Sequence, residues 1–212
     1  MNITERLLLE NKAWVEENTA RDPDFLAHLR EPRHCEVFWI GNSDSRVHAD
    51  EITRSVPGEL LVHRNLGNLV NEHDINLVGA LDYAVNVAHV RHVIVCGHRE
   101  SQAIRAAMRM PDPAAIYANK WLRPIRQLYQ HNRQEVDRQP TDEERCARLV
   151  ELNVVEQVYN LAHLDIIQRA WSQERGPLLH GWVYGLHDAV IKELIVLTPD
   201  TRLDPLYRYD FE

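Results

Sequence analysis

Residues 91–102 read RHVIVCGHRESQ, and this stretch decides how the rest of the sequence is interpreted. An apolar run at 93–95 leads through Cys96 and Gly97 to His98, and a helix is expected from Ser101 onward. A short apolar run without alternation is typical of a parallel strand buried on both faces. Because open α/β folds bind ligands at the carboxyl edge of the sheet, the stretch predicts a ligand site at His98.

The remaining pattern alternates short strands with helices. Further strands are expected near 37–40, 60–65, 178–184 and 194–197, and helices near 74–87 and 146–171. This order predicts an α/β fold, in which helices flank a mostly parallel sheet of about five strands. We expect residues 1–212 to form a single domain. Within it, residues 1–30 are expected to be a helical arm that packs on the main sheet or on a partner subunit.

Composition excludes several classes of protein. The chain has 212 residues, 44% of them hydrophobic, and a net charge of −8. It has no block of lysine and arginine that would bind nucleic acid, no apolar run long enough for a membrane span, and no apolar signal segment near Met1. The three cysteines, Cys35, Cys96 and Cys146, are too widely spaced for a disulfide framework or a paired metal motif. A cytoplasmic location is therefore expected.

A second stretch, FWIGNSDSRV at 38–47, is expected to face the first across the sheet edge. Asp44 and Arg46 lie two residues apart, so an extended backbone would place both side chains on one side as an ion pair. That pair is either a structural salt bridge or part of a site. His98 likewise either caps the next helix or hydrogen-bonds the loop, or it serves as a metal ligand or acid/base group. Cys96 fits a small buried apolar residue.

These motifs together resemble the β class of carbonic anhydrases. That family carries Cys-Ser-Asp-Ser-Arg after its first strand and His-x-x-Cys-Gly-Gly after its third, where this chain has Asn42-Ser43-Asp44-Ser45-Arg46 and His98-Arg99-Glu100-Ser101-Gln102-Ala103. The similarity runs from the helix around Trp14 to about residue 197. Further matching motifs are Pro57-Gly58-Glu59, Val62-His63-Arg64-Asn65, Glu151-Leu152-Asn153-Val154 and His180-Gly181-Trp182.

The resemblance implies a zinc site that this chain lacks in part. In the family two cysteines and one histidine hold zinc, and the zinc-bound water becomes the hydroxide that attacks carbon dioxide. Here Asn42 and Ser101 replace both cysteines, and only His98 remains. Neutral amide and hydroxyl oxygens are poor zinc ligands. No cofactor is therefore expected; the alternative is an unusual metal site formed by His98, Asp44 and Glu100.

Two groups of site residues follow from the resemblance. Asp44 and Arg46 match the family's catalytic pair, and the pocket around them is expected to contain Asn42, His98, Arg99, Ser101 and Gln102. Gln102 replaces a family glycine and is expected to fill part of that pocket. Trp39, Arg64 and Tyr184 match a non-catalytic bicarbonate site of some family members. In the alternative interpretation the two aromatic residues belong to the core and Arg64 pairs with a carboxylate such as Glu59.

The sequence leaves four functions open. The first is a zinc-free relative that binds bicarbonate or another small carboxylate and hydrates carbon dioxide weakly or not at all. The second is a metal-independent enzyme acting on a small acid, with His98 as acid/base group. The third is an active carbonic anhydrase with an unusual metal site, and the fourth is a structural subunit. A homodimer or tetramer is implied for all of them, without nucleic-acid or membrane partners.

Overall fold

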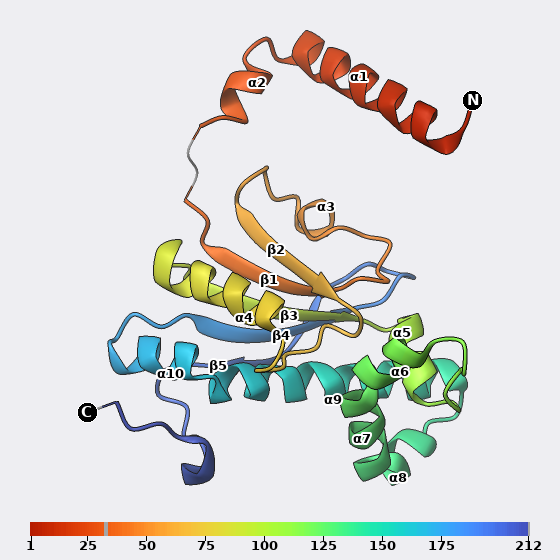
Figure 1. Ribbon diagram of the computed structural model, residues 1–212, viewed down its shortest axis with the longest axis vertical. Coiled ribbons are helices and arrows are strands. Elements are labelled where there is room, and N and C mark those ends of the chain that lie inside the picture. The colour runs from red at the N-terminus through yellow and green to blue at the C-terminus, as the bar shows by residue number, and fades with distance from the viewer. Residues whose placement is uncertain (32–33, 212) are drawn as a thin grey trace. The chain divides into compact units, whose positions relative to one another are not determined.

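The computed structural model describes residues 1–31 and 34–211 and contains a five-stranded sheet flanked by helices (Figure 1). The strands stand in the order β2-β1-β3-β4-β5. Strands β1 to β4 pair in parallel, and β5 runs antiparallel to β4 at one edge. The predicted mostly parallel sheet is confirmed. The strands are β1 (Val37–Asn42), β2 (Leu60–Asn65), β3 (His92–His98), β4 (Leu178–Tyr184) and β5 (Lys192–Leu197).

The helices precede, connect and follow these strands. They are α1 (Ile3–Arg21), α2 (Phe25–His28), α3 (Ala49–Thr53), α4 (Ile75–Asp82) with a π-helical continuation (Tyr83–Val87), α5 (Gln102–Ala107), α6 (Ile116–Trp121), α7 (Arg123–His131), α8 (Arg133–Asp137), α9 (Asp142–His163), α10 (Asp165–Ser172) and a 3₁₀ turn (Pro205–Tyr207).

The two faces of the sheet bury different side chains. Phe38 and Val95 belong to the main core, to which α4, α9 and α10 also contribute. Helix α9 contacts β3, β4 and β5 along this face (Figure 1). Because neighbouring residues of a strand point to opposite faces, Trp39, Ile94 and Cys96 form a smaller cluster on the other side, together with Ala49 of α3.

The helix expected over 146–171 is two helices in the structure. Helix α9 begins earlier, at Asp142, because Thr141 and Glu144 form a capping box. It ends before Leu164, whose backbone is extended, and α10 follows. On an unbroken helix, Ile167 would lie on a different side from Leu161. The break allows both side chains to be fully buried, which local periodicity did not reveal.

Two compact units divide the chain, Met1–His34 and Cys35–Glu212. In the first, α1 has no buried residue, and Trp14 contacts Phe25 edge to face at 5.2 Å. The second contains the whole sheet. None of the helices within 1–31 and 34–211 is sufficiently long and apolar to cross a membrane. The three cysteines are free thiols.

Candidate functional site

The carboxyl ends of four parallel strands bring the predicted site residues together. The register places Gly41 of β1 beside Cys96 of β3, and His98 beside Tyr184 of β4. On the other side of β1, Asn42 lies beside Asn65 of β2. The two stretches that contain Asn42 and His98 therefore meet at one edge, as predicted.

Asn42 and Ser101 form a hydrogen-bonded pair in the centre of the site. Asn42 Nδ2 donates to Ser101 Oγ at 2.7 Å, and the exposed fractions of the two residues are 2% and 0%. Asn42 Oδ1 accepts from the backbone N–H groups of Asp44 and Gly67. Ser101 Oγ also accepts from the Ile104 N–H as the N-cap of α5, and it donates to Asp44. Every hydrogen-bonding position of the Ser101 hydroxyl is therefore used.

The Asp44 carboxylate binds residues at the end of β3 and the start of α5, not the neighbouring Arg46 that its spacing suggested. Its Oδ1 is 2.7 Å from His98 Nε2, and its Oδ2 accepts from the Ala103 N–H at 2.7 Å and from Ser101 Oγ at 3.2 Å. Burial raises the pKa of the Asp44 carboxyl, but the bonds from His98, Ala103 and Ser101 outweigh burial and hold that pKa below its ordinary value. Asp44 is therefore an ionised acceptor, and His98 Nε2 is its donor.

The expected ion pair between Asp44 and Arg46 is not formed. Among the residues that the structure describes, the ion pair of Asp44 is with His98. An ion pair between residues two apart requires an extended backbone, but β1 ends at Asn42 and a turn follows. Alternation of side chains along a strand does not apply there. Arg46 remains a predicted site residue by resemblance alone.

His98 is almost fully buried and oriented by its neighbours. Its exposed fraction is 4%, and its ring stacks on Tyr184 with 6.0 Å between ring centroids. Nε2 is bonded to Asp44, whereas Nδ1 is buried without a hydrogen-bond partner. The expectation that His98 caps the following helix is wrong, because Ser101 caps it.

The side chains present do not fit the family's zinc site. A zinc ion requires three protein ligands here, preferably thiolate or imidazole. Asn42 turns its oxygen to two backbone N–H groups, and the lone pairs of Ser101 Oγ are used. No cluster of three histidine, cysteine or acidic side chains suited to a metal ion occurs in residues 1–31 and 34–211. Glu100, expected in an unusual site, accepts instead from the Leu186 N–H with both oxygens.

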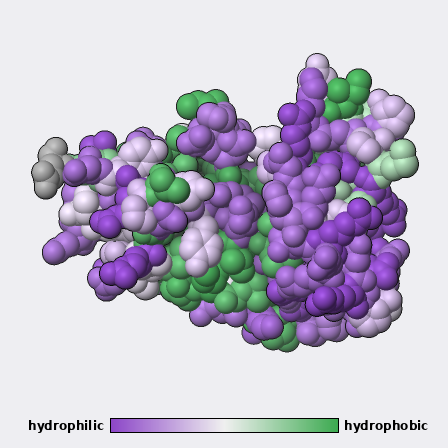
Figure 2. All heavy atoms as spheres, turned by 90° about the horizontal axis from the view of Figure 1, so that it is seen from below, coloured by the Kyte–Doolittle hydropathy of each residue, from purple (hydrophilic) through white to green (hydrophobic). Residues whose placement is uncertain are grey.

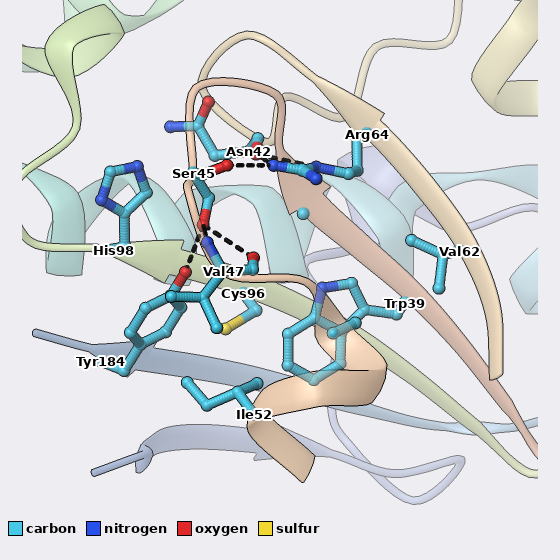
Figure 3. Close-up of a pocket in the computed structure, with 12 residues that line it drawn as sticks. Trp39, Asn42, Ser45, Val47, Ile52, Val62, Arg64, Cys96, His98 and Tyr184 are labelled. Atoms are coloured by element: carbon cyan, nitrogen blue, oxygen red, sulfur yellow. Dashed lines mark hydrogen bonds between the residues drawn. The ribbon is translucent and has the colours of Figure 1, made fainter. Parts of the chain in front are cut away.

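Trp39, Arg64 and Tyr184 line one small cavity together with Asn42 and His98 (Figure 3). Its volume is about 20 Å³, which is enough for about one water molecule. The two predicted groups of site residues are therefore neighbours. Cys96 also lines this cavity, and burial raises the pKa of its thiol, as expected for a residue that serves as a small apolar group.

Arg64 and Tyr184 hold the loop after β1. Arg64 donates through Nε and Nη2 to the Asn42 carbonyl at 3.1 and 2.9 Å, and through Nη2 to the Ser45 carbonyl at 2.6 Å. Ser45 Oγ is 2.5 Å from the Tyr184 hydroxyl. These bonds are drawn in Figure 3. The alternative pairing of Arg64 with Glu59 is wrong, because Glu59 accepts from the Val56 N–H in its own turn.

Two residues expected in the pocket point elsewhere. Arg99 pairs with Glu151 of α9 at 3.3 Å. Gln102, the first residue of α5, is exposed, and its amide donates weakly to the Glu100 carbonyl at 3.4 Å. Neither lines the cavity around His98. The first turn of α5 directs a backbone N–H, that of Ala103, into the site and leaves the Gln102 side chain outside.

Sequence reasoning missed Ser45 and the backbone groups of Gly67 and Ala103. Ser45 lies within the motif at 42–46, and this position could have identified it. Its role depends on bonds to Arg64 of β2 and Tyr184 of β4, which are distant in the sequence. The Gly67 N–H binds Asn42, and Asn153 of α9 fixes the Gly67 carbonyl at 2.9 Å. Backbone donors carry no side-chain signature, which is why spacing did not identify them.

Comparisons with known proteins all find carbonic anhydrases. A family model described as "Carbonic anhydrase" matches residues 37–191. A carbonic anhydrase of Emericella nidulans is 36% identical over 200 residues, which are 94% of this chain and 87% of that protein. A carbonic anhydrase of Pseudomonas aeruginosa is 32% identical over 74% of this chain and 72% of its own length.

Solved structures show the same similarity. A tetrameric β-carbonic anhydrase of Sordaria macrospora superposes with a TM-score of 0.87 at 30% identity, covering 93% of this chain and 100% of that chain. The Coccomyxa β-carbonic anhydrase in complex with acetazolamide superposes with a TM-score of 0.85 at 31% identity, covering 93% and 89%. The residues that the family model matches, 37–191, include the strand ends described above.

Proposed function

Because the chain belongs to the β-carbonic anhydrase family, we propose that it is a zinc-free member of that family. It binds bicarbonate or another small carboxylate, and it hydrates carbon dioxide weakly or not at all. One observation carries this proposal: Asn42 and Ser101, at the two cysteine positions, satisfy each other and their neighbours by hydrogen bonds. A metal ion would have to break that network and would gain no thiolate.

Arg64, Tyr184 and Trp39 supply donors suited to a small planar anion. In the structure the carbonyls of Asn42 and Ser45 accept from Arg64, and the Ser45 hydroxyl is hydrogen-bonded to that of Tyr184. A cavity of about 20 Å³ is too small for bicarbonate beside Ser45. The anion therefore displaces the loop that contains Ser45 and accepts the bonds of Arg64 and Tyr184 itself. Asp44 is the preceding neighbour in that loop, so its bond to His98 responds to binding.

Isothermal titration calorimetry with sodium bicarbonate, at an ionic strength fixed with chloride, tests the binding site. We expect saturable binding that Arg64→Gln weakens by about tenfold or more, because charge-assisted hydrogen bonds are lost. Arg91→Gln is the matched control, since Arg91 is exposed and lies just before the first residue of β3, whereas the site lies at the last residue of that strand. Equal weakening in both variants, or no saturable binding by the unmodified chain, contradicts the proposed site.

Two other functions have support of their own. An active hydratase is favoured by the relatives, which are described as carbonic anhydrases, and it predicts hydration that a chelator abolishes. A metal-independent enzyme acting on a small acid is favoured by the Asp44–His98 bond, which orients the imidazole. In that case His98→Ala abolishes turnover of the acid and leaves the fold intact; unchanged turnover excludes His98 as the acid/base group.

We propose further that the chain is a homodimer or tetramer and that residues 1–30 pack on a partner subunit. The tetrameric relative from Sordaria macrospora supports this assembly. So do Leu7, Leu8 and Trp14 of α1, which are 55%, 68% and 47% exposed, because a row of exposed apolar side chains favours burial. A cytoplasmic location is proposed from the three free cysteines.

A further inference from the structure

A second cavity, which we call the arginine pocket, lies where α5, α7, α8 and the start of α9 meet. Its volume is about 160 Å³, several times the roughly 10–15 Å³ that one water molecule needs. Arg105, Arg109 and Arg145 line it together with Tyr129, Asp137 and Asp142. None of these residues lines the cavity around His98. The right-hand part of the view in Figure 2, where α7 and α8 lie, is mainly hydrophilic.

The acidic residues of the arginine pocket are already paired. Asp137 accepts from the Tyr129 hydroxyl at 2.7 Å and from Arg133 Nε at 3.2 Å, so each of its oxygens has a donor. Asp142 accepts from Arg145 Nη1 at 3.2 Å. Each of the two carboxylates therefore has its own donor. Of the remaining arginines, Arg105 has one long ion pair, with Glu143, which does not line the pocket, and Arg109 has no carboxylate partner within the described part of the chain.

Arg105 and Arg109 lack adequate partners. The Arg105 side chain is 19% exposed, and its Nε is buried without a hydrogen-bond partner. Its ion pair, from Nη1 to Glu143 Oε1, is long at 3.6 Å, and Glu143 is 76% exposed. Arg109 is exposed, and its guanidinium forms no hydrogen bond or ion pair within the described part of the chain. A buried donor without an acceptor is costly, so an acceptor that a ligand supplies to Arg105 would be stabilising.

We propose that the arginine pocket binds a phosphoryl anion, with Arg105 and Arg109 as its principal donors. The planar guanidinium presents paired N–H donors that match two oxygens of a phosphate. Two guanidinium groups without a close carboxylate partner suit a dianion better than a singly charged carboxylate. The cavity volume admits a tetrahedral oxyanion. Inorganic phosphate and the phosphate group of a monoester share this chemistry.

Isothermal titration of the full chain with inorganic phosphate, at an ionic strength fixed with chloride, tests the arginine pocket. We expect one saturable site per chain. Arg109→Gln should weaken binding by about tenfold, the effect of losing a charge-assisted hydrogen bond. Arg138→Gln removes the same charge from an exposed position after α8 that does not line the pocket, and it should change the dissociation constant less than about twofold.

Two further measurements sharpen the test. Asp142→Asn should tighten phosphate binding, because it releases Arg145 from its carboxylate partner. Titration with glycerol phosphate separates the two sources: tighter binding than inorganic phosphate supports a phosphomonoester, and weaker binding supports the free ion. The proposal is overturned if phosphate does not saturate a site, or if Arg109→Gln and Arg138→Gln have the same effect. Circular dichroism spectra verify the fold of each variant.

Discussion

Replacing Ser101 by alanine tests whether the hydrogen-bonded pair at the sheet edge holds the site together. The Ser101 hydroxyl caps α5, accepts from Asn42 and donates to Asp44. Loss of an N-cap costs about 1 kcal/mol. A buried donor left without an acceptor, here Asn42 Nδ2, costs a further 1–3 kcal/mol or so. We therefore expect Ser101→Ala to lower the free energy of unfolding by roughly 2–4 kcal/mol.

Thr141→Ala is the matched control for this variant. Thr141 is also an N-cap, with its hydroxyl accepting from the Glu144 N–H at 3.2 Å, but it is exposed and has no buried partner. Its loss should cost only about 1 kcal/mol. Urea unfolding, followed by circular dichroism and tryptophan fluorescence at one fixed protein concentration, measures both. If Ser101→Ala costs no more than Thr141→Ala, the buried network does not have the role assigned to it.

Three further changes have expected outcomes. Asp44→Asn should be less stable than the unmodified chain at neutral pH. The pKa of Asp44 lies below its ordinary value near 3.8, so its contribution to the free energy of unfolding is complete above about pH 4 and is lost as the pH falls through the lowered pKa. The urea midpoints of the two proteins should therefore converge in acid, and a difference that persists there would contradict the assignment. Gly97→Ala should destabilise the chain by about 1–3 kcal/mol, since the new methyl group would lie 2.8 Å from a methyl of Val154; an unchanged urea midpoint would show that α9 yields. Cys96 and Cys146, both buried and with thiol pKa values raised by burial, should react with a thiol reagent only after unfolding, and modification in the native state would disprove their burial.

The sheet was predictable because its strands are short, apolar and bounded by turns. Five strands were expected, and the structure has them in a mostly parallel sheet. The break at Leu164 was not predictable, because apolar residues continue on both sides of it and the reason for the break is the position of Ile167 in the core. Tertiary packing, not local propensity, ends α9 there.

The sequence predicted which residues form the site better than it predicted the hydrogen bonds between them. Asn42, Ser101 and His98 do meet at the sheet edge, because parallel strands end on one side. The partner of Asp44 was predicted wrongly, because its actual donors, His98 and Ala103, are 54 and 59 residues away and spacing reports only local neighbours. Arg99 and Gln102 were wrongly expected to line the pocket, because the direction of a side chain beyond a strand end depends on the helix that follows.

The zinc content of the purified chain, measured together with carbon dioxide hydration, distinguishes a zinc-free member of the family from an active hydratase. The chain and its Asn42→Cys/Ser101→Cys variant are incubated with zinc, freed of unbound metal by gel filtration, and analysed by mass spectrometry and stopped-flow hydration. We expect little zinc and little hydration for the unmodified chain, and about one zinc per chain with measurable hydration for the double variant. One zinc per unmodified chain, with hydration that a chelator abolishes, would contradict it.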